Sequence, residues 1–275
     1  MGFGQHWFAL CTICAVLIRT LASAAGHEFW IEPTDFSVPE GRRIEADLKV
    51  GQHLSGLSFP YLSNRFSSFK LSEGGLTSDL SGEEGSIPAL GIISKSAGLK
   101  VITYVSTADQ LTYTALEQFV SYAELEGNSW AVEAHKQRGL PETGFVELYT
   151  RCAKALVQVG PVNPSDNDIA IGMPIEFVAL KNPYALKAAT DLPVVLLWSG
   201  KPVPNAQITV FHKTDNVTET RLRTDATGRA SIPLNGGGLF LLSSVYLQEP
   251  PRASKAQWES YWASLTFEIA VAENP

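Results

Sequence analysis

Residues 200–211 read Gly-Lys-Pro-Val-Pro-Asn-Ala-Gln-Ile-Thr-Val-Phe, and residues 223–234 read Arg-Thr-Asp-Ala-Thr-Gly-Arg-Ala-Ser-Ile-Pro-Leu. In each stretch, turn-forming residues come before β-branched residues and an alternation of apolar and polar residues, which is the pattern of a turn followed by a β-strand. In the second stretch, Asp225 can accept hydrogen bonds from backbone amides of its own turn, and Gly228 is free to adopt a positive φ. We therefore expect two strands here, with a hairpin turn at Asp225.

The same pattern of turns and strands extends over most of the chain. Short runs of β-branched and aromatic residues, separated by Gly, Pro, Asn and Asp, are typical of strands and occur at residues 43–50, 99–106, 193–198 and 206–212. Residues 114–138 differ, because their apolar residues approximate helical spacing and charged residues fill many of the gaps. This segment indicates one or two helices inserted in a β domain, with residues 124–126 and 128–130 alternatively forming a mobile surface loop.

A domain boundary is predicted at residues 159–168, where two prolines and several turn formers are concentrated. The second half resembles the Ig-like or prealbumin-like modules of bacterial surface and periplasmic proteins. We expect a mainly β protein of two such β-sandwich domains. The N-terminal domain, with the helical insertion, would span residues 27–160, and the C-terminal Ig-like domain residues 170–275.

The beginning of the chain has the pattern of an export signal. Residues 7–18 are almost wholly apolar, and Ala22-Ser23-Ala24 fits an Ala-x-Ala cleavage site. The apolar run is shorter than the roughly twenty residues that a membrane-spanning helix needs. We therefore expect residues 1–26 to be a cleaved signal peptide, and the mature protein to be periplasmic with no membrane span.

Composition and motifs exclude several function classes. The formal net charge of -7 argues against binding to nucleic acid or to anionic lipid surfaces. Cleavage would leave Cys152 as the single cysteine, which predicts a small buried hydrophobe and no intramolecular disulfide. After the predicted signal peptide, which itself contains Cys11-Thr12-Ile13-Cys14, the chain has no Gly-x-Ser-x-Gly, His-Glu-x-x-His, phosphate-loop or Cys-x-x-Cys motif. We therefore expect a protein that is not an enzyme.

The mature chain places a histidine, His27, at or within two residues of its new amino terminus. Cleavage after Ala24 would let the amine, two amide nitrogens and the imidazole form a square-planar site for Cu(II) or Ni(II). Cleavage after Gly26 would make His27 the first residue, whose amine and ring bind one metal with His53 as a third nitrogen. Cleavage after Ala25 would give a poorer chelate, so the mechanism depends on the cleaved bond.

Two carboxylates lie close to this histidine in sequence. Glu28 and Glu32 can supply oxygen ligands or accept a hydrogen bond from an imidazole N–H. We therefore predict that His27, His53, Glu28 and Glu32 bind a divalent Ni, Co or Cu ion, although His27 can also be read as merely preceding the first strand. Each ligand must lose its proton before it binds, so metal affinity is expected to weaken as the medium acidifies.

Several separated elements suggest a family. They include His-Glu-Phe-Trp-Ile-Glu-Pro at residues 27–33, Val-Gly-Gln-His at 50–53, and the segments 147–156, 174–176, 182–183 and 262–268. In order and spacing, the mature chain resembles the periplasmic family of domain of unknown function 4198, often described as NikK-like and linked to nickel or cobalt uptake. That resemblance implies an exported β-sandwich protein with a divalent-metal role. Related chains often carry a histidine where this chain has Tyr246.

Two functions from different classes follow. The leading hypothesis is an exported metal-binding protein that captures Ni(II), Co(II) or Cu(II) and passes it to components of a membrane metal transporter. The alternative is a cell-envelope interaction module that binds protein or glycan through exposed aromatic residues such as Trp258, Tyr261 and Trp262. We further interpret His135 as a solvated surface residue, and residues 147–154 as the source of a structural ion pair between the two halves.

Overall fold

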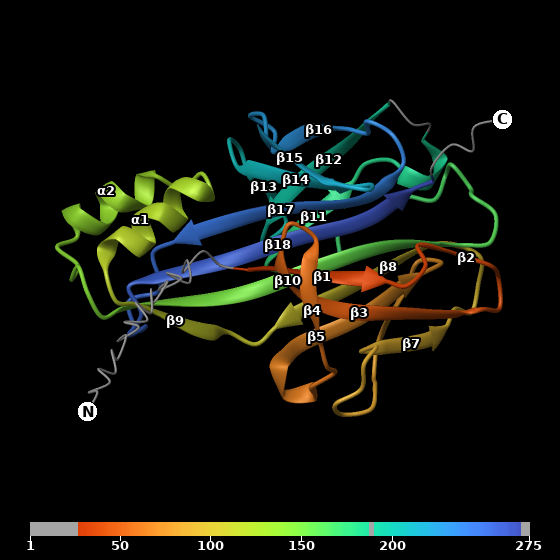
Figure 1. The fold of residues 1–275 in the computed structure, drawn as a ribbon, viewed down its shortest axis with the longest axis horizontal. Coiled ribbons are helices and arrows are strands. Elements are labelled where there is room, and N and C mark those ends of the chain that lie inside the picture. Colours follow the sequence, from red (N-terminus) through yellow and green to blue (C-terminus); the bar gives the residue numbers. More distant parts are fainter. Residues whose placement is uncertain (1–26, 187–189, 271–275) are drawn as a thin grey trace, which may run out of the picture.

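The computed structural model describes residues 27–186 and 190–270, and these residues are mainly β (Figure 1). The predicted signal peptide lies outside the described residues. The elements are β1 (Glu28–Pro33), β2 (Ser37–Val38), β3 (Arg43–Gln52), β4 (Ser55–Phe59), η1 (Ser63–Arg65), β5 (Phe66–Glu73), β6 (Leu76–Asp79), β7 (Leu90–Ile93), β8 (Gly98–Ser106), β9 (Asp109–Tyr113), α1 (Leu116–Leu125), α2 (Trp130–Gln137), β10 (Phe145–Val159), β11 (Ile175–Ala179), η2 (Pro183–Ala185), β12 (Asp191–Trp198), β13 (Lys201–Pro202), β14 (Gln207–Lys213), β15 (Val217–Arg223), β16 (Arg229–Pro233), β17 (Gly238–Gln248) and β18 (Trp258–Ile269).

These strands form a long central sheet and two smaller cover sheets. The central sheet has the order β15-β14-β17-β18-β10-β8-β5-β6, and β2 and β9 also pair with β10. The N-terminal cover sheet has the order β1-β3-β4, with β7 also paired to β3. The C-terminal cover sheet has the order β11-β12-β13, with β16 also paired to β12.

Strand β10 contributes side chains to two separate cores. Cys152 and Leu156 pack with residues of the C-terminal cover sheet, whereas Ala153 and Val157 pack with residues of the N-terminal cover sheet. Because successive side chains of a strand point to opposite faces, the two cover sheets lie on opposite faces of the central sheet (Figure 1). The mainly β, sandwich-type fold is therefore confirmed.

The predicted domain limits, 27–160 and 170–275, stay a prediction. Residues 160–170 connect β10 to β11. The two regions nevertheless share one sheet, because β10 and β18 pair in parallel from Glu147 opposite Trp258 to Ala155 opposite Thr266. Within residues 27–186 and 190–270, no helix has the length and apolar character needed to cross a bilayer.

The turn at Asp225 has the predicted local chemistry and a different role. The Asp225 carboxylate accepts from the backbone amides of Thr227 at 2.7 Å and Arg229 at 3.0 Å, and Gly228 has φ +71°. The hairpin prediction is wrong. Strand β16 pairs with β12 instead of folding back on β15, so the turn carries the chain from the central sheet to the C-terminal cover sheet.

The two helices lie within the predicted segment 114–138 and cover an aromatic cluster at one end of the central sheet (Figure 1). His135 of α2 belongs to this cluster and is 1% exposed, so the prediction of a solvated residue is wrong. Its Nδ1 accepts from the Trp258 indole at 3.0 Å, and its Nε2 lies 3.0 Å from the Pro141 carbonyl. Packing against Phe119 and Phe145 outweighs the polar character of the surrounding sequence.

Of the charged residues in the segment 147–154, Glu147 and Arg151 do not take part in the expected ion pair between the two halves. The buried Glu147 carboxylate accepts hydrogen bonds from the hydroxyls of Tyr113 at 2.7 Å, Tyr122 at 3.3 Å and Ser260. Tertiary partners brought by three different elements therefore satisfy this carboxylate in place of the arginine.

Lys154 supplies the expected ion pair between the two halves, because its partners come after strand β10. Its side chain is completely buried and lies 3.2 Å from both Asp168 and Glu176, whose side chains are also completely buried. Asp168 also accepts from the Ala179 amide, and Glu176 from the amides of Ile171 and Gly172. This cluster attaches the connection before β11 to strand β10.

Replacing Lys154 with Met is expected to reduce the free energy of unfolding by about 3–5 kcal/mol, because it leaves two buried carboxylates without their cation. Chemical denaturation would measure the change. Lys70→Met is the matched control, since Lys70 pairs with Asp79 at 3.7 Å on the surface and its removal should change stability by less than about 1 kcal/mol. Equal effects of the two substitutions would contradict this account of the buried cluster.

Candidate functional site

Strand β1 is buried on both faces and carries two of the predicted ligands. Glu28, Trp30 and Glu32 lie on one face, and Phe29 and Ile31 on the other, because side chains alternate along a strand. The Trp30 indole donates to Glu32 Oε2 at 2.7 Å. Glu32 is therefore engaged within β1, whereas Glu28 lies at the start of the strand, next to the exposed His27.

His53 lies in a strained turn between β3 and β4. Gln52 pairs with Ser55, so His53 and Leu54 form a two-residue turn, with φ +51° and +54° respectively. Such turns normally contain Asn-Gly or similar pairs, because other side chains are disfavoured at positive φ. Leu54 is buried in a small core with Trp30, which holds the turn in place. Strain of this kind is often found at functional sites.

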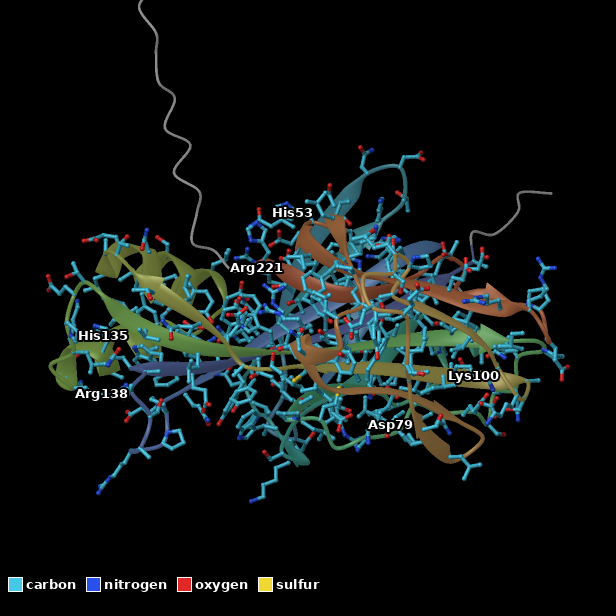
Figure 2. The ribbon with its side chains drawn as sticks, turned by 90° about the horizontal axis from the view of Figure 1, so that it is seen from below. His53, Asp79, Lys100, His135, Arg138 and Arg221 are labelled. Carbon is cyan, nitrogen blue, oxygen red and sulfur yellow. The ribbon has the colours of Figure 1, made fainter. Side chains whose placement is uncertain are left out.

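The turn places His53 at a cavity of about 260 Å³. Figure 2 shows His53 and Arg221 close together on one side of the molecule. The cavity is lined by Glu28, Gln52, His53, Leu125, Glu126, Thr209, Phe211, Glu219, Arg221 and Ser243. It thus brings together β1, the β3–β4 turn, the end of α1 and strands β14, β15 and β17.

Three glutamates make this cavity, which we call the acidic cavity, electrostatically negative. Glu219 lies 3.3 Å from His53 Nε2 and 2.7 Å from Arg221. Glu28 Oε2 is buried and has no hydrogen-bond partner within the described residues. Arg221 is the single permanent cation among the lining residues, so the cavity has an excess of carboxylates.

Burial and mutual repulsion alter the titration of these groups. Burial raises the pKa of Glu28, and the Glu219 carboxylate raises it further, while the backbone amides of Glu28 and His53 and the His53 side chain oppose the shift. Burial also raises the pKa of Glu126 to about 7, with further increases from Glu28 and Glu219 and a decrease from Arg221. A bound cation would offset this repulsion and favour the ionised forms.

The structure therefore brings Glu28 and His53 together, and leaves Glu32 outside the acidic cavity. Sequence reasoning missed Glu126 and Glu219. Glu126 belongs to an acidic run at the end of α1, and Glu219 to an alternating polar strand, and neither pattern is specific for a site. In the part of the chain that the structure describes, no group of three or more His, Cys, Asp or Glu residues has a ready-made arrangement for a metal ion.

Other predicted positions have structural roles. Tyr246 stacks on Trp198 with ring centroids 4.4 Å apart and lines a different cavity, so its position is not part of the acidic cavity. Cys152 is buried, as expected, and burial raises the pKa of its thiol to about 12. Trp258 and Trp262 are 0% and 9% exposed, so they do not provide the exposed aromatic surface of the alternative hypothesis.

A family model described as "Domain of unknown function (DUF4198)" matches residues 24–248. Comparison with curated proteins gave no match. Among solved structures, the chain is similar to the "D0-D1 domain of Intimin", at 14% sequence identity and a TM-score of 0.19, over 86% of this chain and 96% of that chain.

Glu126 should make stability depend on pH. Because folding raises its pKa from 4.5 to about 7, the folded protein holds this proton more tightly than the unfolded chain between these values. The free energy of unfolding should therefore fall as the pH rises through this window, and it should fall less in Glu126→Gln. Urea denaturation between pH 4.5 and 7.5 measures both slopes. Glu124→Gln, at an exposed position of the same helix, should keep the wild-type slope; equal slopes in all three proteins would contradict the prediction.

Proposed function

This chain belongs to the DUF4198 family, and we propose that it is an exported, non-enzymatic protein that captures a divalent transition-metal ion in the periplasm. The ion is Ni(II) or Co(II), with Cu(II) as a further candidate. The protein then delivers this ion to components of a membrane uptake system. The acidic cavity is the capture site.

The observation that carries this proposal is the unpartnered Glu28 carboxylate oxygen. A buried carboxylate oxygen without a hydrogen-bond partner is costly, and a cation is the group that offsets this cost most directly. The cavity adds the His53 imidazole and the carboxylates of Glu126 and Glu219. A mixed set of imidazole nitrogen and carboxylate oxygen suits divalent first-row metals, for which imidazole is a good ligand of Ni and Cu.

Arg221 and the strained turn give the site a means of accepting the ion. Arg221 holds Glu219 at 2.7 Å, and His53 Nε2 lies 3.3 Å from the same residue. An incoming divalent ion competes for Glu219 and His53 and replaces the interaction between them. Glu219 and His53 therefore rearrange when the ion binds, because contacts with the ion replace their contact with each other.

His27 extends the site toward the amino terminus. It immediately precedes Glu28 and is exposed. Cleavage at the predicted signal would place its amine or neighbouring amides beside the acidic cavity, adding nitrogen donors to His53 and Glu28. The cleaved bond lies outside the described residues, so this contribution remains part of the proposal.

Capture is coupled to proton release. Because the pKa of Glu126 is raised to about 7, ion binding near neutral pH drives a proton off this carboxyl group. Acidification reverses the reaction and releases the ion. The interaction-module alternative requires no ion at all, and a protein that takes up no metal would favour it.

The proposal predicts that Glu28→Gln and His53→Ala each weaken binding of Ni(II), Co(II) or Cu(II) by at least about tenfold, because each removes a ligand from the acidic cavity. Isothermal titration of the untagged mature chain, at pH 7.5 and again at pH 5.5, measures the affinity and its decrease in acid. Glu45→Gln is the matched control, because Glu45 is a surface carboxylate paired with Arg43 at 3.3 Å. Wild-type affinity in both cavity variants would contradict the assignment of the site.

A further inference from the structure

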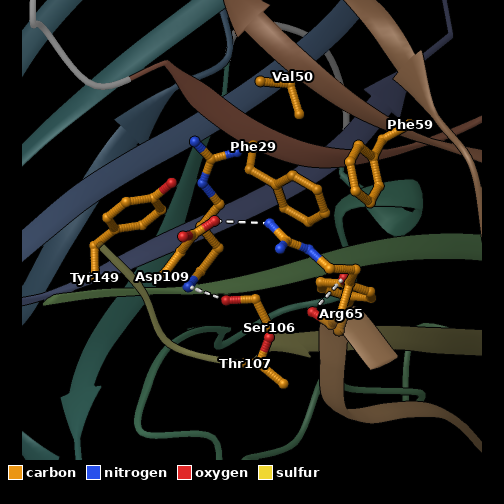
Figure 3. A pocket seen from close by; sticks show the side chains of 10 residues that line it. Phe29, Val50, Phe59, Arg65, Ser106, Thr107, Asp109 and Tyr149 are labelled. Atoms are coloured by element: carbon orange, nitrogen blue, oxygen red, sulfur yellow. Dashed lines mark hydrogen bonds and ion pairs between the residues drawn. The ribbon is translucent and has the colours of Figure 1, made fainter. Parts of the chain in front are cut away.

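Figure 3 shows a second cavity, of about 60 Å³. It lies on the opposite face of β1 from the acidic cavity. The two are separated because Glu28 and Phe29 are successive residues of one strand and point to opposite faces. The second cavity, which we call the arginine cavity, is lined by Phe29, Val50, Phe59, Arg65, Tyr104, Ser106, Thr107, Asp109, Tyr149 and Arg151.

Arg151 is the central group of this cavity. Its guanidinium lies 5.5 Å from the Phe29 ring centroid and 5.4 Å from that of Tyr149, so two aromatic rings hold the cation in place. Its backbone amide donates to Ser106 Oγ at 2.9 Å. Within the described residues, the guanidinium itself has neither a hydrogen bond nor an ion pair. The described residues therefore use none of its five N–H donors.

The carboxylate in the same cavity is already engaged. Asp109 accepts from Arg65 Nη2 at 2.7 Å and from the Gln110 amide at 2.8 Å. Figure 3 shows Arg65 and Asp109 joined across the cavity, with the Tyr149 side chain beside Asp109. The Arg65 and Asp109 charges cancel, which leaves the positive charge of Arg151 uncompensated. Burial lowers the pKa of Arg151, consistent with a cation that has lost much of its water.

The remaining walls indicate the kind of anion that fits. Ser106 Oγ uses a lone pair to accept from Arg151, so its hydroxyl proton is free to bond a ligand oxygen, and Thr107 adds a second hydroxyl. Phe29 and Phe59 provide apolar surface next to these donors. The cavity exceeds the roughly 10–15 Å³ that the centre of one water molecule needs, so it can admit a planar carboxylate group. The nearby Asp109 disfavours a doubly charged anion.

We propose that the arginine cavity binds the carboxylate of a small organic acid. Arg151 donates two parallel hydrogen bonds to the two carboxylate oxygens, as its planar fork allows. The hydroxyls of Ser106 and Thr107 complete the polar contacts, and the hydrocarbon part of the acid lies against Phe29 and Phe59. This binding does not depend on the metal ion that we propose for the acidic cavity.

The test is an NMR titration of the metal-free mature chain with sodium butyrate. Binding should shift the backbone resonances of Ser106, Thr107 and Tyr149, and Arg151→Met should weaken it at least tenfold because the bidentate cation is lost. Arg151→Lys should also weaken binding, since a lysine keeps the charge but not the planar fork. Arg138→Met is the matched control. Arg138 also lies over an aromatic ring, 4.9 Å from Trp258, at the helical end of the molecule (Figure 2), and its loss should leave affinity unchanged.

Three results would overturn the proposal. They are the absence of localised shifts in the wild-type protein, equal affinity in wild type and Arg151→Met, or tighter binding of inorganic phosphate than of butyrate. If Arg151→Met does not fold, the test uses the wild-type protein and Ser106→Ala instead. Butyrate should then shift the wild-type resonances of residues 106, 107 and 149 and bind more weakly to Ser106→Ala; failure of either result would overturn the proposal.

Discussion

The parallel pairing of β10 with β18 is the interaction on which the rest of the structure depends. It runs from Glu147 opposite Trp258 to Ala155 opposite Thr266, and it joins residues that are more than one hundred positions apart in the chain. Both faces of β10 are buried against a cover sheet. Within this ladder, Thr266 also donates its hydroxyl to the Ile31 carbonyl at 2.6 Å, so β18 fixes the position of β1 as well.

Strand β1, once fixed in this way, separates two cavities of opposite charge. Its Glu28 faces the acidic cavity, where three carboxylates outnumber one arginine, and its Phe29 faces the arginine cavity, where the Arg151 cation has no anion. Each cavity holds a buried charge that the described residues do not neutralise. Ligands of opposite charge, a divalent cation on one face and a carboxylate on the other, would complete both. The function we propose therefore rests on the excess carboxylates of one cavity and the unpaired Arg151 cation of the other.

Local sequence patterns were sufficient to predict several of the strands and both helices, whereas tertiary contacts determined the site. The strand at residues 43–50, the helices within 114–138 and the hydrogen bonds of Asp225 follow from periodicity and turn chemistry. The partner of β16 and the burial of His135 do not, because both depend on residues distant in sequence. Glu28 could be named from sequence as a neighbour of the predicted processed terminus, and His53 as a possible third nitrogen ligand for a metal held there. Glu126 and Glu219 join them only because the end of α1 and the β14–β15 pair converge there.

The central claim is that the acidic cavity captures a metal ion beside a processed amino terminus. The most direct test is the intact mass and metal content of the untagged protein, recovered from the compartment to which its own host delivers it. We predict a chain that begins at Ala25 or His27 and carries about one equivalent of nickel, cobalt or copper. A chain that begins elsewhere, and that takes up none of these metals even after incubation with them, would contradict the claim.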